Sequence, residues 1–125
     1  MTLLTARRST CNRLHVGALV VREGRVQGMG YNGPPAGFKH CNHDPWIDEP
    51  CKLSIHAERN AFDFAARYGY GTDGCELFVS HAPCFECAKD IIQVGIIRVH
   101  YLTKFRDMSG VDLLWGAGIE VQHHG

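Results

Sequence analysis

The pattern of apolar and polar residues along the chain predicts strands that alternate with helices. A continuous apolar run over 16–21 predicts a buried strand, and a second strand over 25–30, after a turn at 23–24, completes an antiparallel hairpin. Apolar positions at helical spacing predict a helix over 54–68, with Ser54 as its N-cap. Later in the chain we predict strands over 76–80, 96–102 and 119–121 and helices over 83–94 and 108–116.

Two strands followed by alternating helices and strands are typical of the α/β class. We therefore expect a three-layer α/β/α sandwich with a mixed central sheet, built as a single domain over 1–125. Pro83 fits the first turn of its helix, and Gly95 fits the C-terminal stop. The remaining segments predict a loop over 30–37, an irregular insertion over 38–52 and the end of a short helix over 2–8.

The charge balance argues against a long polyanion as the partner. With 13 basic and 13 acidic residues the net charge is zero, whereas a dedicated nucleic-acid binder usually carries a basic excess. The one local basic excess lies near the start, and it indicates either a solvated surface or one or two phosphate contacts. It consists of Arg7, Arg8, Arg13, Arg22 and Arg25.

We expect neither export nor membrane insertion. Residues 1–6 are too short for a signal peptide and are followed by arginines, and no apolar run approaches the roughly 18 residues that cross a bilayer. The expected compartment is therefore the cytoplasm, of the protein's own cell or of an infected host cell. In that reducing compartment the six cysteines indicate metal ligands or free thiols before disulfides.

The strongest chemical signal combines His56-Ala57-Glu58 with Pro83-Cys84-Phe85-Glu86-Cys87. Zinc takes imidazole and thiolate ligands in a tetrahedron, and a catalytic zinc keeps its fourth position open for water. Cys84 and Cys87 are three residues apart, so they share one face of a helix, and His56 supplies the third ligand. Both segments fall at predicted helix starts, where the positive end of the helix dipole favours thiolate over thiol.

Glu58 lies two residues from His56 and can point into the same pocket without binding the metal. It would take a proton from the metal-bound water, because zinc deaminases use the glutamate of an H-x-E segment as their acid and base. The alternatives are a structural zinc site and a redox-active CxxC pair. A structural site calls for four closed ligands, and a redox pair leaves the H-x-E segment unexplained.

These motifs and their neighbours resemble the deoxycytidylate (dCMP) deaminases of the cytidine deaminase superfamily. The resemblance extends over roughly 8–121, which is nearly the whole chain. It is carried by RSTC at 8–11, VGA at 16–18, GYNG-x-P at 30–35, HAExNA at 56–61, FVSHAPC at 78–84, CAK at 87–89, GI at 95–96, V-x-Y at 99–101 and GAGIEV at 116–121.

The resemblance implies hydrolysis of dCMP to dUMP and ammonia, with a zinc-bound hydroxide attacking C4 and Glu58 as the proton shuttle. It also implies that Asn32 contacts the sugar and that the backbone around Ala57 holds the pyrimidine edge. Asn60 would lie near the pocket, with a role in positioning a phosphate or a loop.

The resemblance further implies regulation and assembly. The segment Gly30, Tyr31, Asn32 and Gly33 resembles the loop through which many members sense dCTP and dTTP, although the same residues also fit a plain tight turn. Family members often assemble as hexamers, so we expect a homo-oligomer.

Some family members carry a second, structural zinc near the entry strand and the insertion. The implied ligands here are Cys11, Cys41, Cys51 and His43, with His40 and His15 as alternatives to the histidine. A metal ion would stabilise an irregular insertion that buries little core. The alternative is three free cysteines. Cys75, in a turn before a strand, is interpreted as structural.

Three other activities compete with dCMP hydrolysis. The substrate could be a deoxycytidylate substituted at ring position 5, which the sequence does not exclude. A deaminase acting on RNA or single-stranded DNA would use the same zinc centre, but neutral charge and the lack of an aromatic and basic patch argue against it. An idle nucleotide-binding protein on a deaminase fold is disfavoured by the intact Glu58.

Overall fold

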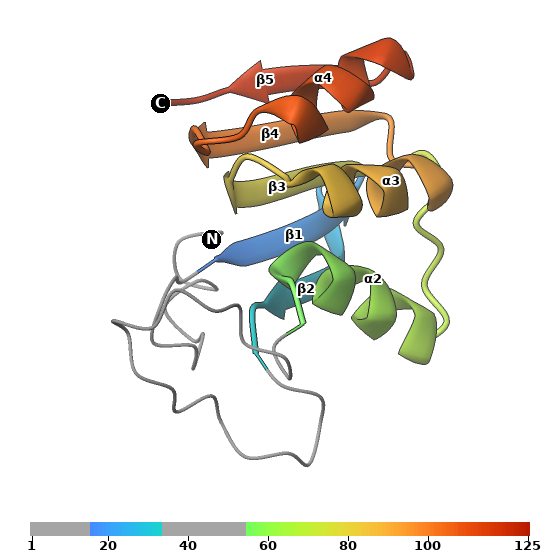
Figure 1. Cartoon of the computed structure of the whole chain (residues 1–125). Coiled ribbons are helices and arrows are strands. Elements are labelled where there is room, and N and C mark those ends of the chain that lie inside the picture. Colours follow the sequence, from blue (N-terminus) through green and yellow to red (C-terminus); the bar gives the residue numbers. More distant parts are fainter. Residues whose placement is uncertain (1–15, 34–54) are drawn as a thin grey trace.

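The structure, a computed structural model, describes residues 16–33 and 55–125 (Figure 1). In this part of the chain five strands form one sheet in the order β2-β1-β3-β4-β5. The strands are β1 (Gly17–Arg22), β2 (Arg25–Tyr31), β3 (Glu76–His81), β4 (Arg98–Thr103) and β5 (Glu120–His123). The helices are α2 (Ala57–Arg67), α3 (Phe85–Gln93) and α4 (Ser109–Gly116).

The strand pairing makes the sheet mixed, which confirms the predicted α/β fold class. β1 pairs antiparallel with both β2 and β3, whereas β3, β4 and β5 run parallel to one another. The predicted hairpin turn joins β1 to β2, and Glu23 and Gly24 adopt φ of 51° and 80° there. Because β1 runs against both of its neighbours, β2 points the same way as β3, and all strands except β1 end at the same edge.

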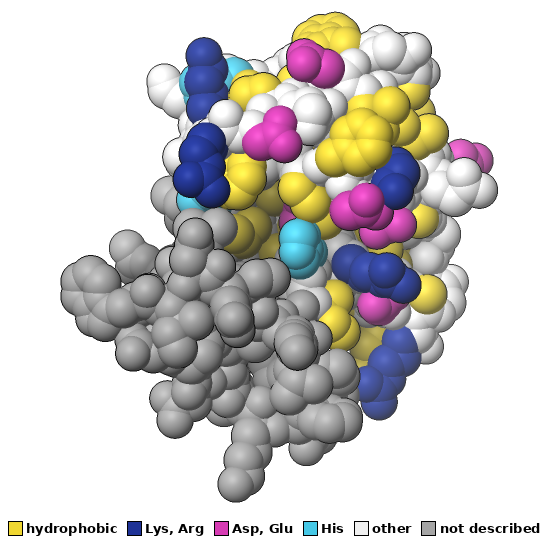
Figure 2. Space-filling model, viewed as in Figure 1, with side chains coloured by type: hydrophobic (Ala, Val, Ile, Leu, Met, Phe, Trp, Pro, Cys, Tyr) yellow, Lys and Arg dark blue, Asp and Glu magenta, His cyan; other side chains and the backbone are white. Residues whose placement is uncertain are grey.

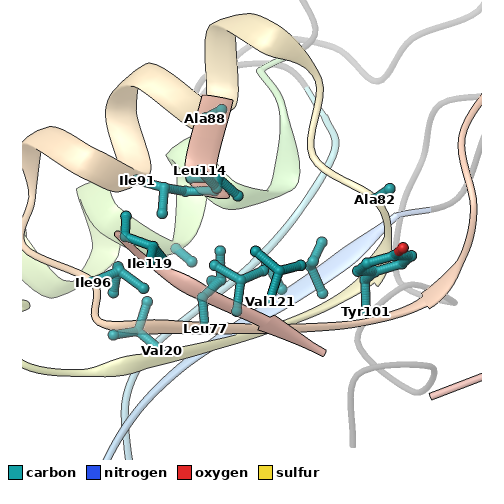
Figure 3. Close-up of a cluster of buried hydrophobic side chains, with 14 of the residues drawn as sticks. Val20, Leu77, Ala82, Ala88, Ile91, Ile96, Tyr101, Leu114, Ile119 and Val121 are labelled. Atoms are coloured by element: carbon teal, nitrogen blue, oxygen red, sulfur yellow. The ribbon is translucent and has the colours of Figure 1, made fainter. Parts of the chain in front are cut away.

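The described helices cover one face of the sheet (Figure 1), and the hydrophobic core fills the space between them. Figure 3 shows Val20 and Leu77 of the sheet facing Ile91 of α3 and Leu114 of α4. All four side chains are fully buried, and removing such apolar surface from water is the main force that holds these layers together.

The third layer of the predicted sandwich stays a prediction. The short helix predicted over 2–8 lies outside the described residues. Within 16–33 and 55–125, no helix is long and apolar enough to cross a lipid bilayer.

The predicted start of α2 was wrong, because a short extended segment precedes the helix. The helix begins at Ala57 with His56 as its N-cap, and not at Ser54. Ile55 pairs with Gly33 in an isolated bridge, with N···O distances of 2.6 and 3.1 Å. The backbone is therefore still extended two residues before the helix, which excludes a cap at the predicted position.

Two other boundaries also differ from the prediction. α3 begins at Phe85 with Cys84 as its N-cap, so Pro83 precedes the helix instead of lying in its first turn. β2 extends one residue beyond the predicted strand, to Tyr31, which shortens the loop predicted to follow it. Both differences arise because side-chain capping and strand pairing decide where an element ends, and composition alone does not report them.

The contact between α2 and β2 requires glycine in the strand. A Cβ atom at Gly30 would lie 2.5 Å from both the carbonyl oxygen of Ala57 and the amide nitrogen of Ala61, whereas nonbonded atoms prefer about 3.5 Å. Gly28 approaches the backbone of Ala61 in the same way. The helix backbone therefore lies directly on the strand, and this contact fixes the first turn of α2 at the end of β2.

Replacing Gly30 with alanine should destabilise the protein by about 1–3 kcal/mol, because the helix must move away from the strand. Gly116→Ala is the matched control, since that residue ends α4 with nothing within 4 Å of the added Cβ. The control should be neutral or stabilise by up to about 1 kcal/mol. Denaturant unfolding measures both changes, and equal midpoints for the two variants would contradict the close contact.

Candidate active site

Three side chains that can bind a metal ion converge where α2 and α3 begin. Nδ1 of His56 lies 3.1 Å from Sγ of Cys87 and 3.5 Å from Sγ of Cys84. The three ligand atoms all lie within 4.8 Å of one another, and no other group of three or more such ligands occurs in the described part of the chain. The structure thus brings together the three ligands that the sequence predicted.

Local structure explains why the two cysteines share one site. Cys84 is the N-cap of α3, and its Sγ accepts a hydrogen bond from the backbone N–H of Cys87 at 3.4 Å. Cys87 follows in the first turn, so its side chain lies on the same side of the helix. His56 is the N-cap of α2, without a side-chain hydrogen bond to the helix. All three ligands therefore lie at the positive ends of helices, at the edge where the parallel strands end.

Hydrogen bonds within this group set the protonation of the thiols. The bond from the Cys87 side chain, helped by His56, lowers the pKa of Cys84 to about 4 against the opposing effect of burial. The same bond, together with burial, raises the pKa of the Cys87 thiol. The hydrogen bond with Cys84 also raises the pKa of His56. Cys84 is therefore the thiolate, and a bound cation would displace the protons of its two partners.

The chemistry and spacing of the three ligands fit zinc. Zinc–sulfur bonds of about 2.3 Å and zinc–nitrogen bonds of about 2.0 Å, at a tetrahedral angle, separate the two kinds of ligand by about 3.5 Å. The distances from His56 to the cysteines lie at or slightly below that value. Among the described residues no fourth ligand joins the group.

Glu58 lies in the first turn of α2, beside the ligand group but outside it. The residue is 4% exposed, and burial raises its pKa to about 7 despite an opposing hydrogen bond from the backbone. A carboxyl group with this pKa both accepts and releases a proton near neutral pH. The position two residues after His56 therefore provides a buried group suited to acid and base chemistry.

Asn60 connects the first turn of α2 to the end of β2. Its side-chain amide donates to the carbonyl of Tyr31 at 2.7 Å and to the carbonyl of Ile55 at 3.4 Å. The two acceptor carbonyls lie on the backbone next to the Gly33–Ile55 bridge, so the side-chain amide of Asn60 is already engaged there. Of the roles implied for Asn60, this geometry favours positioning of the loop over donation to a substrate.

Asn32 is held against the start of β1. Its Oδ1 accepts a hydrogen bond from the N–H of Val16 at 2.9 Å, and its own N–H donates to the carbonyl of Val16 at 3.2 Å. Ala57 is buried in the first turn of α2. The implied contacts of Asn32 and Ala57 with a substrate stay predictions.

The implied second metal site cannot be compared with the structure. Its ligands Cys11, Cys41, Cys51 and His43 lie outside the described residues. Gly30 and Tyr31 of the implied regulatory segment belong to β2, and Gly33 pairs with Ile55. The proposed sensing of nucleotides by that segment stays a prediction.

The loop that joins β4 to α4 borders the same site, and the sequence analysis did not recognise it. The N–H of Ala82 donates to the carbonyl of Thr103 at 2.9 Å, so the loop begins beside the segment that leads to Cys84. Gly110, in the first turn of α4, lies against the carbonyl groups of Pro83 and Cys84. The sequence offered one signal for this neighbour of the site. The loop directly follows the strand that was predicted after the helix with the PCxxC motif.

Comparison with known families connects this site to an established group of enzymes. Residues 1–103 match the family model for the cytidine and deoxycytidylate deaminase zinc-binding region. The chain is 43% identical over 122 residues to ComE operon protein 2 of Bacillus subtilis and 34% identical over 135 residues to a deoxycytidylate deaminase of Schizosaccharomyces pombe. These alignments cover 95% and 99% of this chain, but only 65% and 42% of the two relatives.

The fold also matches a solved structure, that of dCMP deaminase from the cyanophage S-TIM5 in complex with dCMP and dUMP. The TM-score is 0.91 at 36% identity, covering 98% of this chain and 90% of that chain. These matches confirm the resemblance that the sequence motifs indicated. The ligand geometry, the fold and the family match agree, and this chain belongs to the cytidine and deoxycytidylate deaminase family.

Proposed function

We propose that the chain hydrolyses dCMP to dUMP and ammonia, with zinc held by His56, Cys84 and Cys87 and with Glu58 as the proton carrier. The observation that carries this proposal is the convergence of three zinc-type ligands beside a buried carboxyl group. Ligands alone would fit many metal sites, and a buried carboxyl alone would fit a structural role. Hydrolysis of an amidine C–N bond needs both at one place.

Three observations support dCMP as the substrate. The Schizosaccharomyces pombe relative is named a deoxycytidylate deaminase, and the similar cyanophage enzyme was solved with dCMP and dUMP. The zero net charge also suits a mononucleotide better than a polynucleotide. The name of the Bacillus subtilis relative states no substrate, so the assignment rests on the other relatives.

The residues account for the proton movements of the reaction. Water adds to C4, the C4–N bond breaks, and the two protons of the water end on ring N3 and on the departing ammonia. When bound, zinc lowers the pKa of a water in its open position and so supplies the nucleophile. In the proposed mechanism the carboxyl group of Glu58 holds each proton in transit, and its burial would keep bulk water from competing for that proton.

Purified protein should release ammonia from dCMP and contain about one zinc per chain, or about two if the implied second site forms. Ammonia release and metal analysis on the same preparation measure both. Zinc without turnover of dCMP would contradict the substrate and direct the assay to 5-substituted dCMP, then to single-stranded nucleic acid. Turnover that persists after removal of all metal would contradict the zinc mechanism.

Glu58→Gln should keep zinc but lose about 10² to 10⁴ in kcat, because the amide cannot carry a proton. Asp63→Asn is the matched control, since it makes the same change at an exposed position of α2, and its kcat should not change. Steady-state kinetics with metal analysis measures both variants. Near-normal turnover by the Glu58 variant would show that another group carries the proton.

Cys84→Ser should lose both the catalytic zinc and the activity, because a hydroxyl is a poor substitute for a thiolate ligand. Cys75→Ser is the matched control, since that thiol is also free but lies fully buried outside the ligand group. It should keep its zinc while losing about 1–3 kcal/mol of stability from the buried hydroxyl. Catalytic-site zinc retained in full by the Cys84 variant would overturn the ligand set.

A further inference from the structure

We propose that His100 and His124 form a binding site for a divalent transition-metal ion, Ni²⁺ or Cu²⁺, with Glu76 as the carboxylate that orients His100. The site lies on the face of the sheet that is turned away from the described helices. It shares no residue with the candidate active site, and it goes beyond the proposed function.

Alternation along β4 and β5 places both histidines on this face. Val99 and Val121 belong to the core beneath the helices, so His100, the next residue on β4, points to the other side. His124 follows Val121 by three residues and therefore shares that side, and its backbone N–H donates to the carbonyl of Tyr101 at 2.8 Å. Hydrogen bonds of the sheet thus fix the backbone from which each side chain begins.

His100 is held in one orientation and one tautomer. Its Nε2 lies 3.0 Å from Oε1 of Glu76, and hydrogen bonds from His100 and Arg98 hold the pKa of that carboxyl below its usual range. Because a carboxylate only accepts hydrogen bonds, Nε2 of His100 carries the hydrogen and Nδ1 presents its lone pair. Phe78 stacks on the imidazole, with ring centroids 4.3 Å apart and planes 7° apart. A carboxylate behind a histidine is the arrangement that supports metal ligands.

His124 brings a second ring nitrogen to the same place. Its Nε2 lies 2.8 Å from Nδ1 of His100, and in this arrangement it donates its hydrogen to that atom. Neutral imidazole carries its hydrogen on either nitrogen, so the other tautomer of His124 turns a second lone pair toward the same space. His100 is buried and His124 is exposed, which gives an ion access from solvent and lets the outer ring turn toward it.

The spacing of the two nitrogens selects the ion. Imidazole nitrogens about 2.05 Å from one ion lie about 3.3 Å apart at a tetrahedral angle and about 2.9 Å apart at a right angle. The observed 2.8 Å fits the right angle, which Ni²⁺ and Cu²⁺ prefer, whereas Zn²⁺ prefers a tetrahedron. Water molecules would complete the shell of the ion. The pair therefore differs in metal preference from the zinc-type ligands at the helix starts.

The surrounding charges favour a cation. Glu76, Arg98 and Glu120 are register partners across β3, β4 and β5, and Arg98 lies 2.8 Å from Glu76 and 2.7 Å from Glu120. Two carboxylates therefore share one guanidinium, which leaves one negative charge beside the imidazole rings. Figure 2, by contrast, shows Lys and Arg side chains interspersed with Asp and Glu side chains over the helices, so charge marks no cation site on that surface.

Calorimetric titration of the zinc-loaded protein with Ni²⁺ tests the site. Wild type should bind about one Ni²⁺ per chain. Glu76→Gln should weaken that binding about 10- to 100-fold, which is the usual effect of losing a supporting carboxylate, and His124→Ala should weaken it at least as much because a ligand is lost. Octahedral Ni²⁺ is paramagnetic, so it should also broaden the NMR amide signals of Tyr101 and Gln122, which lie next to the pair.

His123→Ala and Glu120→Gln are the matched controls. His123 is also an exposed histidine, but its Nε2 lies 3.0 Å from the carbonyl of Leu102. Glu120 also pairs with Arg98, and among the described residues it makes no hydrogen bond to His100. Both variants should bind Ni²⁺ as wild type does, which separates the proposed ligands from a general effect of a surface histidine or of negative charge.

Ni²⁺ binding that is absent from wild type, or unchanged in His124→Ala, would overturn the inference. Equal losses in the Glu76 and Glu120 variants would overturn the orienting role of Glu76. The zinc content and the turnover of dCMP should be the same in His124→Ala as in wild type. Failure of the proposed reaction therefore leaves the Ni²⁺ result intact, and failure of the Ni²⁺ site leaves the reaction intact.

Discussion

The close packing of α2 on β2 is the contact on which the site depends. Because the strand presents Gly28 and Gly30, the helix backbone lies directly against it, and His56 takes its place at the end of the strand as the helix N-cap. In the sheet, β1 is the one strand that lies between β2 and β3. The start of α3 follows β3 at the same edge, so two helix starts that are distant in the sequence meet with ligand atoms 3.1 and 3.5 Å apart.

The chemical character of the site follows from this geometry. Hydrogen bonds from the Cys87 side chain, from His56 and from the Cys87 backbone lower the pKa of Cys84 to about 4, whereas burial raises the pKa of Glu58 to about 7. A divalent cation at the ligand group would displace protons from the other ligands and favour the ionised form of Glu58. Metal binding and the proton affinity of the neighbouring carboxyl are therefore coupled, and the same burial that raises the pKa keeps the group out of bulk water.

Local chemistry was predictable from the sequence, and long-range arrangement was not. The ligands were found because two cysteines three residues apart and an H-x-E segment are short motifs whose chemistry does not depend on distant residues. The start of α2 was misplaced because the Ile55–Gly33 bridge joins residues that no local pattern connects. The bonds from Asn60 to the backbone were missed for the same reason. The loop after β4 was not recognised as a neighbour of the site, because its position depends on the parallel register of β3 and β4. Sequence periodicity does not report that register.

Net charge and local charge answer different questions about a ligand. A zero net charge argues against a long polyanion, because such binding sums many phosphate contacts over an extended surface. A mononucleotide offers one phosphate, so its binding needs far fewer cationic contacts. Among the described residues, Lys89 and Arg98 pair with carboxylates, which weakens the positive field that a nucleic-acid strand would follow. A neutral chain whose cations are partly paired therefore suits a ligand with a single phosphate better than a nucleic-acid strand.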